Sequence, residues 1–198
     1  MTALLVVILS IVFGFLAWSQ WIWKHHARHS GGVFQKEYLD FADIKPGNVI
    51  LDIGAYSGVT SIIFAGLTGP GGHVYAFEAD KTNYACAKTN IDQAKEAGLG
   101  NISLFPKAVW SHCNGLLFSN EGSMGSSAVA ITGGGRGEES MIESITIEQL
   151  CADNDLKRID FAKIDIEGGE TELLRCSARA LKSLGARLII EPHHVGGY

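Results

Sequence analysis

The sequence predicts an α/β domain with a mostly parallel sheet covered by helices on both faces, preceded by a separate hydrophobic segment. Three observations support this. Short apolar runs alternate with segments of helical periodicity from about residue 33 to residue 190. The first run ends in a glycine-rich turn over residues 52–58. Residues 3–23 carry no charge. The 198 residues therefore divide into an appendage, residues 1–30, and one domain, residues 31–198.

The uncharged stretch 3–23 has the length of a transmembrane helix. At ~1.5 Å per residue it would extend about 31 Å, which matches a bilayer core. Three tryptophans cluster at its end, where aromatic rings favour the interface, and Lys24 and Arg28 follow. No small-residue cleavage site is present, so we expect an uncleaved, single-pass membrane anchor. The positive-inside rule then places the domain on the cytoplasmic side.

Apolar periodicity predicts the elements of the first half of the domain. Residues 33–42 are expected to form a helix that ends at the Lys-Pro-Gly triplet before residue 48. The apolar run 49–53 is typical of a parallel strand buried on both faces. The elements expected after it are helix 59–67, strand 73–77, helix 82–97 and strand 102–105, extendable to residue 109.

In the second half, strands 116–118 and 144–147 are expected to flank a loop rich in glycine and serine, with residues 133–137 as its most flexible part. Thr146 and Gln149 have the spacing of a capping box, which predicts a helix from residue 147 to about residue 151 or beyond. Strand 161–166, helix 169–183 and strand 188–190 complete the prediction.

Composition excludes some classes of function. The net charge of -5 provides no basic surface for a polynucleotide, so nucleic-acid binding is disfavoured. The four cysteines form no CxxC pair and suit no zinc knuckle. We expect them to be small buried apolar residues in a reducing compartment.

The carboxyl ends of parallel strands are where ligands bind in such sheets. At the first strand end, Asp52 opens the turn that closes at Gly58, and the helix after it offers free N–H groups to an anion. The turn lacks the GxGxxG dinucleotide fingerprint and the chain has no Walker-type GK[ST]. An acidic residue here would repel a pyrophosphate but could receive the ammonium group of a methionine moiety. Glu78 ends the second strand 20 residues after Gly58, where its carboxylate could accept hydrogen bonds from ribose hydroxyls.

The runs VILDIGAYSG, VYAFEAD, KAVW, ITIEQL, KIDIEGGE and LIIEPHH, in this order, resemble the FkbM-type methyltransferases from about residue 33 to residue 198. The resemblance implies a class I methyltransferase (Rossmann-like) three-layer sandwich with S-adenosyl-L-methionine as methyl donor. It also implies O-methylation of a hydroxyl on a sugar, glycolipid or other small molecule, with an acceptor that could be lipid-linked.

The same resemblance carries over a set of site residues. Asp165 falls near the transferred methyl group, and Lys107 falls with its two neighbours beside the adenine. The cofactor-binding residues implied are Asp52, Gly54, Tyr56, Ser57 and Gly58 on the methionine side, Glu78 and Ala79 at the ribose, Ala108 and Val109 at the adenine, and Asp165.

Methylation of a hydroxyl requires that the hydroxyl lose its proton, so a base near the methyl group would be useful. The catalytic candidates are Asp165, Glu167 and His193. Asp165 could equally serve only to orient substrate, with proximity supplying most of the rate. Glu170 is expected to be a solvated residue of the first helical turn.

A metal at the fifth strand end remains an alternative. Glu191, His193 and His194 could join Asp165 or Glu167 around a divalent ion. Adjacent histidines on an extended segment point in opposite directions, however, so we assign no metal site.

A class I methyltransferase sheet normally has seven strands, whereas five main strands are predicted here, so we expect the sequence to be incomplete at its C-terminus. Two other functions remain open. An NAD-dependent or nucleotide-sugar oxidoreductase is disfavoured by the missing GxGxxG and Tyr-x-x-x-Lys patterns. A non-catalytic cofactor-binding module would also be consistent with a shortened sheet.

Overall fold

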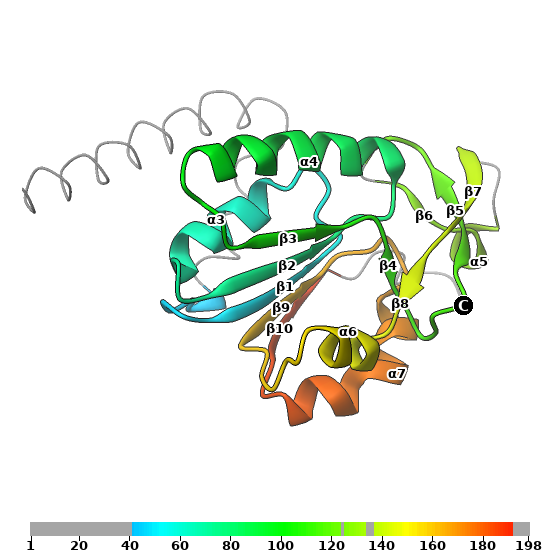
Figure 1. The fold of residues 1–198 in the computed structure, drawn as a ribbon. Coiled ribbons are helices and arrows are strands. Elements are labelled where there is room, and N and C mark those ends of the chain that lie inside the picture. The colour runs from blue at the N-terminus through cyan, green and yellow to red at the C-terminus, as the bar shows by residue number, and fades with distance from the viewer. Residues whose placement is uncertain (1–40, 124, 134–136, 192–198) are drawn as a thin grey trace, which may run out of the picture. The chain divides into compact units, whose positions relative to one another are not determined.

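The computed structural model describes residues 41–123, 125–133 and 137–191. Its centre is a five-stranded sheet in the order β10-β9-β1-β2-β3, in which every neighbouring pair is parallel (Figure 1). The strands are β1 (Val49–Ile53), β2 (His73–Phe77), β3 (Ile102–Phe105), β9 (Phe161–Ile164) and β10 (Arg187–Ile190). The predicted parallel sheet is confirmed, with its main strands within three residues of the expected bounds.

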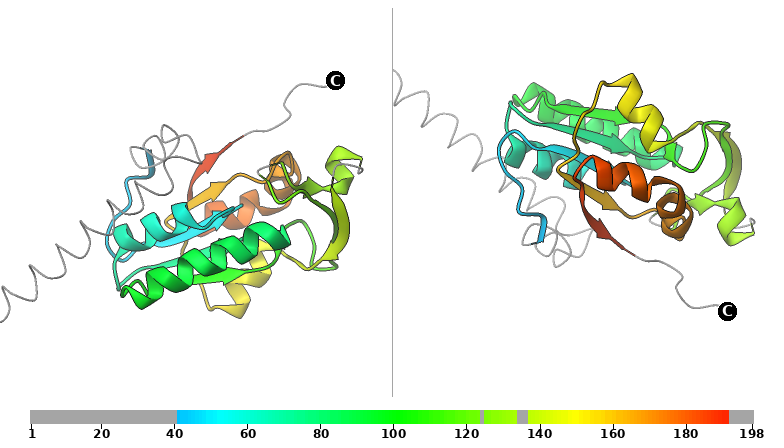
Figure 2. Two further views of the ribbon diagram at one scale, coloured as in Figure 1. Left: turned by 90° about the horizontal axis from the view of Figure 1, so that it is seen from above. Right: turned by 90° about the horizontal axis from the view of Figure 1, so that it is seen from below.

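Helices cover both faces of this sheet, as predicted. α3 (Val59–Thr68) and α4 (Lys81–Glu96) lie on one face, while α6 (Ile147–Asp153) and α7 (Glu170–Ser183) lie on the other (Figures 1 and 2). Asp80 caps α4 and Thr146 caps α6, each by accepting hydrogen bonds from the first backbone N–H groups of its helix. The three layers are thus helices, sheet and helices.

Strand β1 has different chemistry on its two faces, because successive side chains of a strand point in opposite directions. Leu51 and Ile53 belong to the apolar core beneath α6 and α7. Asp52 points the other way, where the Ser61 hydroxyl of α3 donates a hydrogen bond of 2.6 Å to its carboxylate. A charged group is therefore buried in the centre of the sheet, which apolar packing alone does not account for.

The strand order reverses between β1 and β9. From β1 the chain moves outward to β2 and β3, and it then returns to the other side of β1 as β9 and β10. The crevice outside the carboxyl ends at such a switch point is the usual ligand site of an open parallel sheet. The turns that follow β1 and β9 meet there.

The segment between β3 and β9 differs from the prediction. β4 (Ala108–Val109) pairs in parallel with β8 (Ser144–Ile145), and β5 (Leu116–Asn120) lies between β6 (Ser127–Ala128) and β7 (Glu138–Ile142). The short α5 (Val129–Thr132) follows β6. This three-stranded sheet lies beyond the carboxyl ends of the main strands (Figure 1).

Two expectations for this segment were wrong. The third strand does not extend to residue 109, because the chain leaves the main sheet after Phe105 and pairs again only in β4 with β8. The segment between residues 118 and 144 is not simply a loop, because β7 lies in it and pairs with β5. A strand that begins with two glutamates has little apolar alternation, so its pairing partner rather than its composition determines it.

The N-terminal predictions fall on residues that are not described. The anchor of residues 1–30 lies outside the described part of the chain, as does nearly all of the helix expected over 33–42. Among residues 41–123, 125–133 and 137–191, no helix has the length and apolarity needed to cross a bilayer.

The cysteines contradict the expectation that they are buried. Cys86, Cys113 and Cys176 are exposed, Cys151 is half-buried, and all four are free thiols. On α4 and α7 the inward positions beside them are taken by Ala87 and Ser177, so the cysteines face outward.

Removal of the α6 cap is expected to destabilise the domain. The Thr146 hydroxyl accepts a 3.1 Å hydrogen bond from the Gln149 backbone N–H, and such caps contribute about 1 kcal/mol. We expect Thr146→Ala to lower the free energy of unfolding by about 1 kcal/mol in urea denaturation. Thr146→Ser keeps the hydroxyl and serves as the control; equal destabilisation of both variants would contradict a capping role.

Candidate functional site

The backbones of two turns approach each other closely at the switch point. Gly54 has a φ of 84°, and a Cβ atom there would lie 1.8 Å from the backbone oxygen of Asp165. Glycine is therefore required both for the backbone conformation and for the contact between the turns. Gly58, with φ of 76°, has a different neighbour: a Cβ there would lie 3.3 Å from Ala87 of α4. These two glycines let the turn after β1 lie between β9 and α4.

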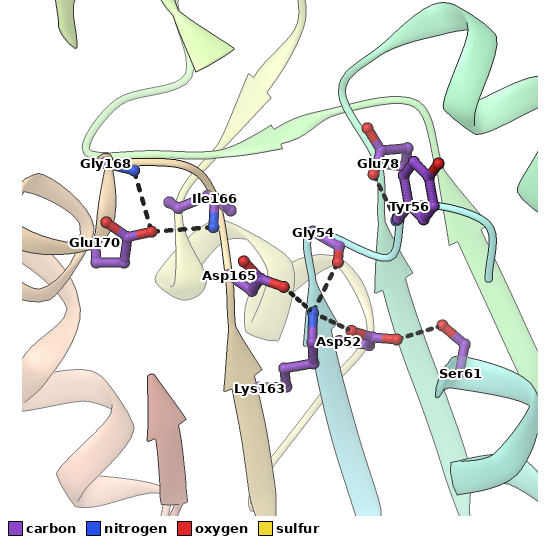
Figure 3. Close-up of polar contacts among 10 residues, drawn as sticks. All are labelled: Asp52, Gly54, Tyr56, Ser61, Glu78, Lys163, Asp165, Ile166, Gly168 and Glu170. Carbon is purple, nitrogen blue, oxygen red and sulfur yellow. Dashed lines mark hydrogen bonds and ion pairs between the residues drawn. The ribbon is translucent and has the colours of Figure 1, made fainter. Parts of the chain in front are cut away.

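A buried lysine, which the sequence analysis did not single out, connects the two strand ends. The Lys163 ammonium donates to the Gly54 carbonyl oxygen at 2.8 Å and lies 3.1 Å from Asp165 and 3.5 Å from Asp52 (Figure 3). Asp52 and Lys163 are direct neighbours across β1 and β9. Asp52 is fully buried and Lys163 is only 4% exposed, whereas the Asp165 side chain is 24% exposed.

The opposite charges in this cluster shift one another's pKa values toward the ionised forms. Burial alone would lower the pKa of Lys163, but the attraction of Asp52 and Asp165 outweighs it and raises that pKa, so the lysine remains an ammonium ion. Burial raises the pKa of Asp52, and Lys163 and the Ser61 hydroxyl only partly oppose this. Lys163 and the Ser61 hydroxyl are thus the groups that favour the ionised form of Asp52.

This arrangement adds a structural role for Asp52. Its carboxylate is fully buried and contacts Ser61 and Lys163, and its contact with a ligand's ammonium group, directly or through water, stays a prediction. Asp52 contributes indirectly, by holding the lysine that binds the Gly54 carbonyl. A lysine within the apolar run FAKI was the available sequence signal, because a charge in a doubly buried strand needs a partner.

Glu78 fixes the other side of the turn. One carboxylate oxygen accepts a 2.7 Å hydrogen bond from the Tyr56 N–H and the other accepts a 2.9 Å bond from the Asp80 N–H. Tyr56 has a φ of 50°, a conformation that costs energy in a non-glycine residue and that this bond stabilises. Burial raises the pKa of Glu78 to about 7, although the two backbone donors oppose the shift.

The N-terminus of α3 is open to an anion. Within the described part of the chain, no side chain caps it, and its first turn holds no acidic residue. The first N–H groups of a helix have no partner in the helix and carry a partial positive charge. They are suited to a carboxylate or phosphate, as the sequence predicted.

The turn after β9 is held by a glutamate that was expected to be solvated. Glu170 is instead 5% exposed, and its carboxylate accepts hydrogen bonds from the N–H groups of Ile166 at 3.1 Å and Gly168 at 3.2 Å (Figure 3). Glu170 therefore fixes the backbone on which Asp165 and Glu167 lie. Glu167 is half-buried and has a φ of 53°.

The remaining predicted site residues differ in burial, and some lie outside the described part of the chain. Ser57 and Ala79 are half-buried beside the turn and the end of β2, and Ala108 is half-buried in β4. Val109 belongs to the apolar core, and its place beside an adenine stays a prediction. His193 lies outside the described residues, as does His194. Among the residues that are described, no group of three potential ligands could hold a metal ion.

A separate hollow of about 470 Å³ lies along β8. The 2.9 Å ion pair between Lys107 and Glu143 lies in its wall, together with the side chains of Gln149 and Asp153. Its lining includes neither the turn after β1 nor the ends of β2 and β9. The converging polar groups described above therefore form a different site.

The residues at the switch point fit S-adenosyl-L-methionine. Each Glu78 oxygen keeps an acceptor lone pair after its backbone hydrogen bond, which is what a ribose diol needs. The open N-terminus of α3 suits the carboxylate of the methionine moiety.

Comparison with known proteins gives a consistent result. Residues 52–198 match the family described as the methyltransferase FkbM domain. The solved structure of methyltransferase FkbM from Methylobacillus flagellatus KT is similar, with a TM-score of 0.52 and 18% identity over 72% of this chain. This chain covers 32% of the length of that protein. A search of curated proteins finds no match.

Two further structures are similar at lower TM-scores. A SAM-dependent methyltransferase from Aquifex aeolicus has a TM-score of 0.42 and 15% identity, with 83% of this chain and 69% of that one covered. Precorrin-6y C5,15-methyltransferase from Geobacter metallireducens GS-15 has a TM-score of 0.46 and 16% identity, with 79% and 60% covered.

Removal of the buried lysine should be strongly destabilising. Lys163→Met would leave the Asp52 charge buried without its ammonium partner, and breaking a buried pair costs about 3–5 kcal/mol. We expect a loss of this size in chemical denaturation, and recovery of at least part of it in the Asp52→Asn/Lys163→Met double variant. The exposed Lys182 offers a control, because Lys182→Met should change stability by less than about 0.5 kcal/mol. A double variant no more stable than Lys163→Met would contradict the pairing.

Stability should also depend on the ionisation of Glu78. Its pKa is raised from 4.5 to about 7 in the folded chain, so its contribution is fully present below pH 4.5 and is lost as the pH rises through 7. At ~1.4 kcal/mol per unit of pKa, the loss approaches about 3 kcal/mol. We expect the difference in unfolding free energy between the native chain and Glu78→Gln to shrink by about this amount between pH 4.5 and pH 8. A difference that is constant with pH would show that folding does not raise the pKa of Glu78.

Proposed function

This chain belongs to the FkbM family of S-adenosyl-L-methionine-dependent methyltransferases, and we propose that it transfers the methyl group to a hydroxyl of a sugar, glycolipid or other small molecule. The observation that carries the proposal is the convergence of Glu78, the open N-terminus of α3 and the partly exposed Asp165 around one glycine turn. The three groups come from the ends of β2, β1 and β9, which are adjacent in the main sheet.

The donor side of the proposed site is held rigid by the protein's own contacts. Glu78 binds the Tyr56 N–H and Lys163 binds the Gly54 carbonyl oxygen, so both ends of the turn are fixed. Such preorganisation matters because the geometry need not be created when the ligand binds. The bound donor supplies a methyl group on a positively charged sulfur.

On the acceptor side, Asp165 is the residue we propose to face the reacting hydroxyl. It follows β9 directly, beside the turn, and its side chain is 24% exposed. Two roles are open to it: it can accept the proton of the hydroxyl, or it can orient the hydroxyl by a hydrogen bond. Glu167 and His193 remain proposed alternatives as the base.

The N-terminal segment leads to a second part of the proposal. Its uncharged run, its tryptophans and the cations after it support a membrane anchor with the domain on the cytoplasmic side. An enzyme tethered in this way meets substrates at the bilayer surface at a raised effective concentration. We therefore propose that the acceptor is a glycan or small molecule carried on a lipid.

The test of methyl transfer uses the full chain, methyl-labelled donor and a membrane extract, followed by identification of the labelled product. The proposal predicts label on a hydroxyl oxygen. It fails if the folded protein shows no calorimetric binding of S-adenosyl-L-methionine. Binding without any labelled product would instead favour the non-catalytic module.

Two substitutions at Asp165 separate its possible roles. If Asp165 is the base, Asp165→Asn and Asp165→Ala should both lower turnover by about 10²-fold or more, because neither can take the proton. If it only orients the hydroxyl, Asp165→Asn should keep turnover within about tenfold of the native enzyme while Asp165→Ala loses more. Unchanged turnover in both would remove Asp165 from the reaction.

A further inference from the structure

One buried carboxylate next to the proposed donor site has a role that methyl transfer does not explain. Asp80 is fully buried just after β2, and one of its oxygens caps α4 by accepting hydrogen bonds from Thr82 N–H at 2.8 Å and Asn83 N–H at 2.9 Å. Its other oxygen turns away from the helix. It accepts a 3.0 Å bond from the Gly122 N–H and a 2.7 Å bond from the Ser126 hydroxyl.

These last two donors belong to the turn that joins β5 to β6. Asp80 thus holds the three-stranded sheet β6-β5-β7, which lies beyond the carboxyl ends of the main strands in Figures 1 and 2. The Lys81 N–H also donates a 3.3 Å hydrogen bond to Asn120 of β5, and the chain connects the two sheets through β4 and β8.

Neighbouring contacts strengthen the same junction. The Asn83 amide donates to the Ser123 backbone oxygen at 2.9 Å, and the Ser126 hydroxyl oxygen accepts from the Glu121 N–H at 2.9 Å. Gly122 has a φ of 61°, and a Cβ there would lie 3.4 Å from the Thr82 side chain. The turn between β5 and β6 is therefore fitted to the first turn of α4.

The same residue also contacts the proposed ribose-binding group. The Asp80 backbone N–H donates a 2.9 Å hydrogen bond to Glu78. Any shift of Asp80 therefore moves a donor to Glu78 at one end and two donors from the three-stranded sheet at the other. Burial tends to raise the pKa of Asp80, but its hydrogen bonds outweigh this and hold the pKa below its usual value. The carboxylate is thus charged, and its hydrogen bonds belong to the stronger, charge-assisted class.

We propose that Asp80 is a positioning residue that couples donor binding at Glu78 to the placement of the three-stranded sheet over the carboxyl ends of the main strands. This coupling rests on the proposed function. When the donor's ribose binds Glu78, the movement of that carboxylate is restricted, and with it the movement of Asp80, which binds Glu78 through its N–H and binds Gly122 and Ser126 through its side chain. Asp80 holds the sheet over the site in the ligand-free chain, and donor binding tightens this hold.

The test is hydrogen exchange of the full chain with and without S-adenosyl-L-homocysteine, together with calorimetric affinity for the same compound. In the native chain we expect this compound to slow exchange not only around residues 54–58 but also in residues 116–128. Ser126→Ala removes the hydroxyl that donates a hydrogen bond to Asp80. It should speed ligand-free exchange of residues 116–128 about tenfold, as for loss of one charge-assisted hydrogen bond. It should also abolish the ligand-induced protection there, while the dissociation constant stays within about threefold.

The controls are matched to this change. Ser123→Ala removes an exposed hydroxyl of the same turn, which accepts a hydrogen bond from the Gly125 N–H and does not contact Asp80. It should leave the protection of residues 116–128 intact. Asp80→Asn keeps one acceptor oxygen, so whichever way its amide turns, either the α4 cap or the hold on the sheet is lost. We expect it to weaken binding of S-adenosyl-L-homocysteine by about tenfold as well as to abolish protection.

The outcomes separate this proposal from the one on which it rests. A native chain that binds S-adenosyl-L-homocysteine but shows no protection of residues 116–128 would overturn the coupling and leave the methyltransferase proposal standing. Protection that survives in Ser126→Ala would also overturn it. A native chain that binds no S-adenosyl-L-homocysteine would overturn both, while ligand-free exchange would still show whether Asp80 holds the sheet.

Discussion

The ammonium group of Lys163 is the contact on which the proposed site depends. It lies between the ends of β1 and β9, where it binds the Gly54 carbonyl oxygen and pairs with Asp52 and Asp165. A charge buried so deeply is stable only because two carboxylates and a carbonyl surround it. The same requirement fixes the geometry: the glycine turn cannot move away from β9 without leaving the lysine partly unsatisfied. The ion pairs of Lys163 with Asp52 and Asp165 thus hold the glycine turn in place against β9.

Three buried carboxylates surround this turn, and each is stabilised differently. Asp52 faces an ammonium ion and a hydroxyl, Glu78 accepts two backbone N–H groups, and Asp80 accepts four donors. The pKa of Glu78 is about 7 and that of Asp80 lies below its usual value. Glu78 accepts fewer hydrogen bonds than Asp80, and its oxygens keep acceptor capacity for a ligand. A binding site requires such free acceptor positions, because a carboxylate whose hydrogen-bonding capacity is filled by the protein cannot bind a ligand's hydroxyl groups.

The segment between β3 and β9 adds a second layer to the fold. Its three-stranded sheet lies outside the carboxyl ends of the main strands, where an acceptor would have to approach. Asp80 connects this sheet to the same strand end that carries Glu78. A short chain of hydrogen bonds therefore joins the donor side of the proposed reaction to the acceptor side. Binding of the donor can in this way influence binding of the acceptor.

The sequence by itself determined the main sheet, the helices on both faces and the position of the ligand site, because these depend on local periodicity and on glycine turns at strand ends. It also located Glu78 and Asp165 correctly at those ends. Only the tertiary structure decided the burial of Asp52, the pairing of Lys163, the buried role of Glu170 and the strand β7. Each of these depends on a partner distant in the chain: Lys163 lies 111 residues from Asp52, beside it only because β9 pairs with β1. The local hydrophobic pattern of a sequence indicates which side chains face inward, whereas the order of the strands in the sheet determines which residue pairs with a buried charge.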